Sequence, residues 1–217
     1  MSAAEPLRIP IDVIGDVASA ECFIGLHLIQ AVVASAPGLA VDIRWHPFEI
    51  NPELPPEGQD RAAFLEEKYG TPQEAREALA SLAEIAREFR LAFAFDKIGR
   101  QPNTLEAHRV VRLARNFGAE IKMVEALFGA FFHDGQDVGD RGVLVALAAK
   151  TGLDRRLVAD FLAGAEDIEA LRQELTGFRA LGVEHVPRFI IAGKNTISGI
   201  IPAEDFADAL FGSIEEE

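Results

Sequence analysis

The chain has 217 residues, of which 49% are hydrophobic and 26% are charged, a profile typical of a globular protein with a substantial core. Its formal net charge of -14 gives little attraction for nucleic acid or for an anionic membrane surface, so neither is expected as a partner. A single cysteine, Cys22, excludes an intrachain disulfide and a multi-cysteine metal site, and no metal is expected.

Three features of the sequence bear on the cellular location of the protein. Residues 1–8 include Glu5 and Pro6 and lack the basic and apolar regions of a signal peptide. No apolar run approaches the roughly 20 residues that a helix needs to cross a bilayer. A lone thiol also suits a reducing compartment, so we expect a cytoplasmic protein.

The first elements are two strands with a helix between them. Residues 9–14 are rich in β-formers and residues 41–45 alternate between apolar and polar, which predicts two strands. Residues 19–34 carry a helical pattern, ended by Pro37 and Gly38. Strand, helix, strand is a βαβ unit, so the two strands should be parallel with a right-handed crossover.

The secondary-structure pattern of the sequence changes in the middle of the chain. From residue 61 to about residue 164 almost every signal is helical. Thr71, Pro72 and Glu74, for example, are typical of an N-cap, a first-turn proline and a capping-box glutamate. The pattern predicts an inserted all-helical domain over residues 59–167.

Strand signals return near the end of the chain. The expected elements are a helix at about 166–181, strands at 188–191 and 196–198 joined by a turn at 193–195, a helix from 203 to about 211, and a frayed acidic tail at 215–217. The whole order predicts an α/β, thioredoxin-like fold. Its core domain would comprise residues 1–58 and 168–217, interrupted by the helical domain.

The junction of the first strand and the first helix carries the most informative motif. It reads Asp16-Val17-Ala18-Ser19-Ala20-Glu21-Cys22-Phe23-Ile24-Gly25. This resembles the D-x-x-C-P-W-C-[YF]-I-G element of the DsbA family, in particular its FrnE-like branch, with Ser19 replacing the first cysteine and Cys22 the second. Four further segments look like FrnE-type segments in the same order: residues 46–52, 103–109, 137–144 and 182–189.

The resemblance implies an altered redox centre. In a dithiol relative the first cysteine supplies a thiolate, stabilised by the helix N-terminus, and the second resolves the mixed disulfide. A serine hydroxyl cannot cycle in this way, so disulfide exchange should be weak or absent. Ser19 can still donate a hydrogen bond to the thiolate of a ligand such as glutathione, while Cys22 is expected to be more buried and less reactive.

A second group of relatives keeps the glutathione alternative open. The kappa-class glutathione transferases and 2-hydroxychromene-2-carboxylate isomerases look like thioredoxin folds with the same insertion and a serine at the helix start, where glutathione is bound. Their S-P-[YW]-S pattern is absent, because Ala20 and Glu21 stand at its centre. Glu21 would also offset part of the helix-dipole benefit.

Three functions therefore remain open. The first is a DsbA/FrnE-like oxidoreductase-family protein with a Ser-x-x-Cys site that binds a thiol such as glutathione. The second is a glutathione-dependent isomerase or transferase, and the third is a non-catalytic binding module. The expected ligand is a small-molecule thiol or electrophile, or a peptide, and the relatives imply a homodimer.

Beside Ser19 and Cys22, six residues are candidates for substrate binding: Phe48, Asn103, Val186, Pro187, Arg188 and Ser198. Val186-Pro187 resembles the cis-proline element of the thioredoxin fold, which presents backbone groups to a ligand. Arg188 could attract a ligand carboxylate. Simpler roles compete at three positions, since Ser19 and Asn103 suit helix caps and Cys22 suits a small buried hydrophobe.

Overall fold

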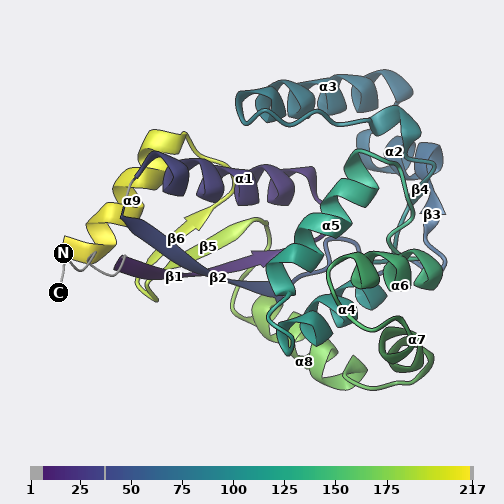
Figure 1. Ribbon diagram of the computed structural model, residues 1–217. Coiled ribbons are helices and arrows are strands. Elements are labelled where there is room, and N and C mark those ends of the chain that lie inside the picture. The colour runs from purple at the N-terminus through teal and green to yellow at the C-terminus, as the bar shows by residue number, and fades with distance from the viewer. Residues whose placement is uncertain (1–6, 37, 216–217) are drawn as a thin grey trace.

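The computed structural model describes residues 7–36 and 38–215 (Figure 1). The predictions made on residues 1–6, on Pro37 and on the end of the acidic tail, residues 216–217, fall outside this part of the chain. Within it, no helix is both long and apolar enough to span a bilayer.

A four-stranded mixed sheet with the order β2-β1-β5-β6 forms the centre of the fold. The strands are β1 (Leu7–Gly15), β2 (Leu39–Pro47), β5 (Arg188–Ile191) and β6 (Asn195–Ser198). β1 runs parallel to β2 and antiparallel to β5, and β5 is antiparallel to β6. The predicted parallel βαβ unit and the terminal hairpin are both confirmed.

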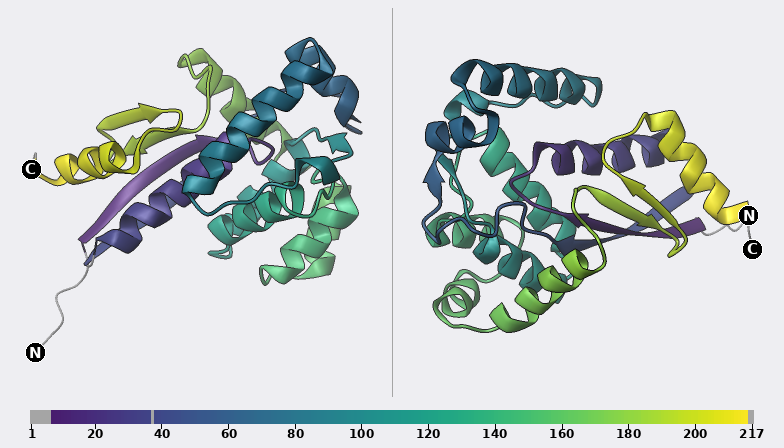
Figure 2. Two further views of the ribbon diagram at one scale, coloured as in Figure 1. Left: turned by 90° about the horizontal axis from the view of Figure 1, so that it is seen from above. Right: turned by 180° about the vertical axis from the view of Figure 1, so that it is seen from behind.

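Helices cover both faces of this sheet, because its side chains are apolar on both. The helices α1 (Ala20–Ser35) and α9 (Ala203–Glu215) lie together on one face, and α8 (Ile168–Ala180) lies against the other (Figures 1 and 2). Ile11 and Val13 of β1 join the main core on the α1 face, whereas Ile14 packs with Phe178 of α8. The result is the α/β, thioredoxin-like fold that the sequence predicts.

The segment between β2 and α8 is mostly helical. It contains β3 (Gln59–Asp60), α2 (Arg61–Tyr69), α3 (Pro72–Glu88), a 3-10 turn (Phe95–Lys97), β4 (Arg100–Gln101), α4 (Leu105–Arg115), α5 (Glu120–Phe132), α6 (Arg141–Lys150) and α7 (Arg155–Ala163). Thr71 caps α3 as expected, accepting a hydrogen bond from the Glu74 amide at 3.2 Å. The domain boundaries at 59 and 167 stay a prediction.

One feature of this segment departs from an all-helical description. β3 and β4 pair as an antiparallel ladder of two residues each. Two residues are too short to show the alternating pattern by which a strand is recognised in a sequence.

The insertion and the sheet share one hydrophobic core. Phe23 of α1 stacks on Phe128 of α5 with ring centroids 4.8 Å apart, and Phe132 lies 5.9 Å from Phe23. Trp45 of β2 meets Phe128 edge to face at 5.8 Å. This packing brings α1 against α3 and α5 of the insertion, with the N-terminal end of α1 next to α5 (Figure 1).

Candidate functional site

The site begins where β1 passes into α1. Gly15 ends β1 in a position that has no room for a side chain, because a Cβ there would lie 2.7 Å from the Trp45 ring and 3.1 Å from the Cys22 sulfur. Asp16 then fixes the turn. One of its carboxylate oxygens accepts from the Ala18 amide at 3.1 Å and the other from the Ile50 amide at 2.8 Å. Asp16 therefore ties the loop before α1 to the loop after β2.

A buried polar group lies beneath these loops. His108 of α4 is fully buried, with Nε2 3.1 Å from the Phe48 carbonyl oxygen and 3.6 Å from Asp16 Oδ1. The pKa of the neighbouring Glu49 carboxyl is raised by burial, an effect that His108 opposes and Asp16 reinforces. Asp16, Glu49 and His108 form a polar support under the site.

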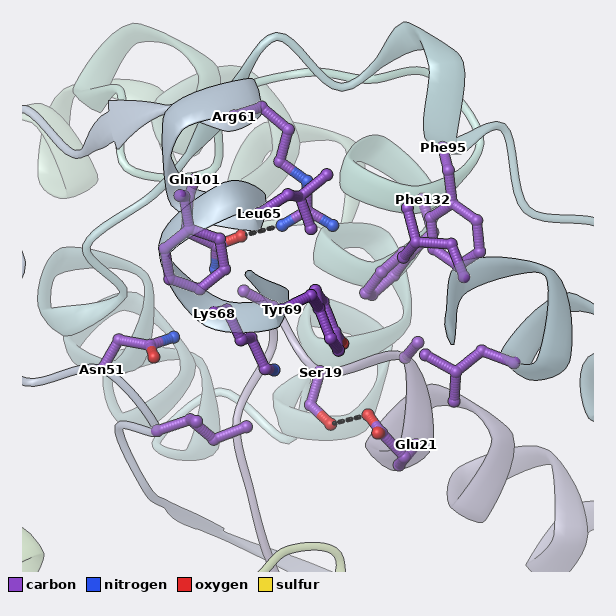
Figure 3. Close-up of a pocket in the computed structure, with 16 residues that line it drawn as sticks. Ser19, Glu21, Asn51, Arg61, Leu65, Lys68, Tyr69, Phe95, Gln101 and Phe132 are labelled. Carbon is purple, nitrogen blue, oxygen red and sulfur yellow. Dashed lines mark hydrogen bonds between the residues drawn. The ribbon is translucent and has the colours of Figure 1, made fainter. Parts of the chain in front are cut away.

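Ser19 is the N-cap of α1 and uses both hydrogen-bonding capacities of its hydroxyl within the protein. The oxygen accepts from the Cys22 amide at 3.2 Å. The hydroxyl donates to Glu21 Oε2 at 3.0 Å (Figure 3). Its residue exposure is 3%, so only a small part of it borders open space. A ligand that accepts the Ser19 proton must displace Glu21.

Cys22 lies one turn further into α1 and is completely buried. Burial raises the pKa of its thiol far above the usual range, and the hydrogen bond with Ser19 only partly opposes this. Nucleophilic attack needs the thiolate, so a buried and protonated thiol is a poor nucleophile.

Ser19 borders a narrow crevice between the α1 N-terminus and the insertion (Figure 3). Its lining residues are Ala18, Ser19, Ala20, Glu21, Ile50, Asn51, Arg61, Phe64, Leu65, Lys68, Tyr69, Leu79, Leu82, Phe95, Gln101 and Phe132. A water-sized sphere finds about 50 Å³ of space in it. An adjoining hollow of about 370 Å³ shares Ile50, Asn51, Phe64 and Lys68 with the crevice.

The charges around the crevice differ in sign from the chain as a whole. Two basic side chains, Arg61 and Lys68 of α2, line it, whereas Glu21 is its one acidic lining residue in the described part of the chain. An anionic ligand would meet two cations there in a protein whose net charge is -14.

Two predicted binding residues support the loops rather than line the crevice. Phe48 is buried under the Arg179 guanidinium, 4.8 Å from its ring centroid, and packs with Val186. The Asn103 amide donates to the Leu54 carbonyl at 2.8 Å, and its side-chain oxygen accepts from the Leu105 amide at 3.0 Å. Asn103 precedes Thr104, the N-cap of α4, and its side chain ties the start of this helix to the loop that borders the larger hollow.

The remaining predicted residues lie at the end of the sheet. The Val186-Pro187 bond is cis, and Pro187 packs against α1 beside Gly25. Arg188 of β5 pairs in register with Ser198 of β6. The crevice lining includes none of these four residues, so their binding roles stay predictions.

The structure also adds lining residues that the motif did not identify. Asn51, Arg61, Lys68, Tyr69 and Gln101 belong to the β2 loop, to α2 and to β4. No local pattern marks them, because only the docking of the insertion on α1 brings them beside Ser19. In the described ranges, no group of three or more His, Cys, Asp or Glu residues is placed to hold a metal ion.

Solved structures share this architecture. A probable DsbA oxidoreductase, SCO1869 from Streptomyces coelicolor, is 28% identical with a TM-score of 0.87, covering 96% of this chain and 91% of that chain. The cytosolic disulfide reductase DsbM from Pseudomonas aeruginosa, solved with GSH, is 18% identical with a TM-score of 0.64, covering 95% and 99%. A 2-hydroxychromene-2-carboxylate isomerase is 15% identical with a TM-score of 0.65, covering 95% and 93%. The last two show similarity of fold.

The DSBA-like thioredoxin domain family matches residues 10–211, nearly the whole chain. This match agrees with the mixed sheet, the helical insertion and the motif at the start of α1. The chain belongs to the DSBA-like thioredoxin domain family.

Proposed function

We propose that this protein is a DsbA-like, FrnE-type member with an altered Ser-x-x-Cys site, poor in dithiol exchange, that binds a small thiol such as glutathione at the N-terminus of α1. The observation that carries the proposal is the pair of residues at the helix start. A hydroxyl borders the crevice where a dithiol enzyme needs its attacking sulfur, and the lone thiol is buried and protonated.

The helix start offers a sulfur anion three favourable contacts. The first turn of α1 carries N–H groups without intrahelical partners and the positive end of the helix dipole. The Ser19 hydroxyl can turn from Glu21 to a ligand thiolate, and Arg61 and Lys68 add positive charge. A thiolate bound there would be held rather than oxidised, because no second accessible thiol exists to form a disulfide.

The shape of the site supports a ligand larger than a bare thiol. About 50 Å³ beside Ser19 accommodates the sulfur end of a molecule, and the adjoining hollow of about 370 Å³ is of the size that ligand pockets have. Ile50, Asn51, Phe64 and Lys68 line both spaces, so a tripeptide such as glutathione could extend from one into the other along these side chains.

The second candidate is a glutathione-dependent isomerase or transferase. The apolar side of the larger hollow, formed by Ile50, Leu54, Pro55 and Phe64, favours it because an electrophile needs space next to the thiolate. The fold is similar to that of the 2-hydroxychromene-2-carboxylate isomerase. In such a reaction the bound sulfur would form the new bond and Ser19 would hold it in place.

Titration calorimetry with glutathione tests the thiol site. We expect binding to the native protein and a loss of about tenfold or more in Ser19→Ala, because a hydrogen bond to a charged group contributes roughly 1.5–3 kcal/mol. The matched control is Asp154→Ala, which removes the N-cap of α7, a helix that lines neither space, and should leave the affinity unchanged. Equal binding in Ser19→Ala, or none in the native protein, contradicts the proposal and favours a binding module for another ligand.

The two catalytic alternatives differ in a spectrophotometric assay. Conjugation of glutathione to 1-chloro-2,4-dinitrobenzene forms a carbon–sulfur bond and releases chloride. Turnover that disappears in Ser19→Ala would favour the transferase or isomerase. Binding without turnover would favour the first candidate.

Localisation and assembly belong to the same proposal. The lone reduced cysteine supports a cytoplasmic protein. The homodimer that the relatives imply would appear in light scattering as about twice the chain mass of 23.6 kDa.

A further inference from the structure

Arg61 is a partly buried cation without an acidic partner. It begins α2, and its guanidinium extends into the crevice beside Ser19 (Figure 3). Nη1 donates to the Gln101 side-chain oxygen. The buried Nε has no hydrogen-bond partner, and among residues 7–36 and 38–215 no carboxylate lies within ion-pair distance of the group.

The other buried or half-buried arginines of the insertion are all paired. Arg109 has Glu106 at 2.7 Å, Arg112 has Asp167 at 2.6 Å, and Arg115 has Glu120 at 2.7 Å. A buried charge without a counter-charge is costly, so proteins normally pair it. Arg61 is the exception, and it faces the crevice.

Arg112 shows which group satisfies the hydrogen-bond donors of a half-buried guanidinium in this protein. Its Nε and Nη2 donate to the two oxygens of Asp167, at 2.6 and 2.7 Å. In Arg61 the same edge, Nε and Nη2, has no partner among the described residues, while Nη1 is held by Gln101. The protein fixes the orientation of Arg61 and leaves the carboxylate-binding edge unpaired.

The surroundings of Arg61 select a monoanion with an apolar body. The Phe64 ring lies 5.7 Å below the guanidinium, and Leu65, Phe95 and Phe132 are further lining residues. Burial lowers the pKa of Arg61, as expected for a cation that lacks a counter-charge. A planar carboxylate matches the two donors of one guanidinium edge. A phosphate dianion would bring a second negative charge into a crevice that Glu21 also lines.

We propose that the Nε and Nη2 edge of Arg61 binds the carboxylate of a small organic acid in the crevice beside Ser19. The assignment does not require a thiolate at Ser19, and one carboxylate of glutathione would satisfy the same edge of Arg61. Arg188, the residue expected from the sequence to attract a ligand carboxylate, does not line the crevice. We assign that role to Arg61, because the docking of α2 places it on the crevice. No sequence motif indicates this position.

Calorimetry with 3-phenylpropionate and its neutral isostere 3-phenylpropionamide tests the assignment. The acid should bind the native protein at least tenfold more tightly than the amide. Arg61→Gln should remove this preference, and Arg61→Lys should retain part of it. Arg155→Gln, an exposed arginine of α7, which contributes no lining residue, serves as the matched control and should bind like the native protein.

The assignment would be overturned by no binding of the acid at millimolar concentration, by equal binding of acid and amide to the native protein, or by an unchanged preference in Arg61→Gln. The melting temperature of Arg61→Gln, expected to be unchanged or raised because an unpaired buried charge is removed, separates loss of the site from loss of the fold. Inorganic phosphate should compete more weakly than acetate, and the reverse would contradict a carboxylate site. The outcome does not depend on thiol binding, so failure of glutathione to bind leaves it intact.

Discussion

At the scale of single residues, Glu21 competes with any ligand for the hydrogen bond that the Ser19 hydroxyl can donate. The hydroxyl donates to the Glu21 carboxylate at 3.0 Å, and both residues border the crevice. A carboxylate in the first turn stabilises a helix, but here it also competes with any anion that approaches the same dipole. Under the proposed function, Glu21 is therefore expected to lower the affinity of the site for a thiolate.

Replacing Glu21 with glutamine should strengthen thiol binding. We expect the glutathione dissociation constant of Glu21→Gln to fall about two- to fivefold, since charge near a helix terminus contributes roughly 0.3–1 kcal/mol. Glu204→Gln, in the first turn of α9, is the matched control and should have no effect. Weaker binding in Glu21→Gln would show that Glu21 helps to hold the ligand.

Cys22 should be chemically inert in the folded protein. Its thiol is fully buried and burial raises its pKa, so the thiolate population at pH 8 is very small. Alkylation by iodoacetamide, followed by mass spectrometry, should be at least 100-fold slower in buffer than in concentrated urea. Equal rates in the two conditions would mean that the sulfur is accessible.

At the scale of elements, α1 packs on the sheet through Gly25. A Cβ at this position would lie 2.7 Å from the Phe189 ring and 3.1 Å from Pro187. The glycine lets the helix approach β5 and the loop before it closely, which fixes the orientation of the helix start that carries Ser19.

Gly25→Ala should therefore destabilise the fold. Overpacking of this kind costs about 1–3 kcal/mol, which urea unfolding would measure. Gly177 in the middle of α8 is the matched control, because a Cβ there meets nothing within 4 Å. Gly177→Ala should stabilise the protein by roughly 0.5–1 kcal/mol, and a similar gain for Gly25→Ala would refute the close-packing argument.

The elements differ in how far the sequence predicts them. Thr71 and Pro72 start α3 as expected, because caps depend on a few adjacent residues. The ladder of β3 and β4 was missed, since it forms only when Gln59 meets Gln101 across the insertion. The same limit applies to the site. Ser19 follows from a local motif, whereas Arg61 reaches the crevice only through the docking of α2.

At the scale of the whole molecule, a charged cluster joins the sheet to the helices. His46 of β2 lies between Asp12 of β1, at 2.7 Å, and Glu174 of α8, at 3.2 Å. Glu174 also pairs with Arg112 of α4. Burial lowers the pKa of His46, but the hydrogen bonds with Glu174 and Asp12 outweigh it and the pKa is raised overall. Burial raises the pKa of Glu174, but His46 and Arg112 outweigh it and the pKa is lowered.

The directions of these two pKa shifts define the pH range over which both side chains contribute fully to stability. The contribution of His46 is complete below its unfolded pKa of about 6.5 and is lost as the pH rises through its higher folded pKa. The contribution of Glu174 is complete above its unfolded pKa of about 4.3 and is lost as the pH falls through its lower folded pKa. Both contributions are complete between about pH 4.3 and pH 6.5.

The unfolding free energy of the native protein should therefore exceed that of His46→Gln most strongly within this window. The difference should decrease as the pH rises above about 6.5, as measured by urea unfolding at a series of pH values. The control is His185→Gln, which removes a histidine at an exposed position outside the cluster. A difference that grows toward alkaline pH would contradict the role of the cluster.

Loss of dithiol exchange through the serine at position 19 is the central claim, and insulin reduction by dithiothreitol tests it most directly. The native protein should not accelerate the reaction, whereas Ser19→Cys, which restores a Cys-x-x-Cys element, should accelerate it at least tenfold. Acceleration by the native protein equal to that of Ser19→Cys would contradict the account. The account would also be contradicted if neither protein accelerated the reaction, because the missing thiol would then not explain the loss.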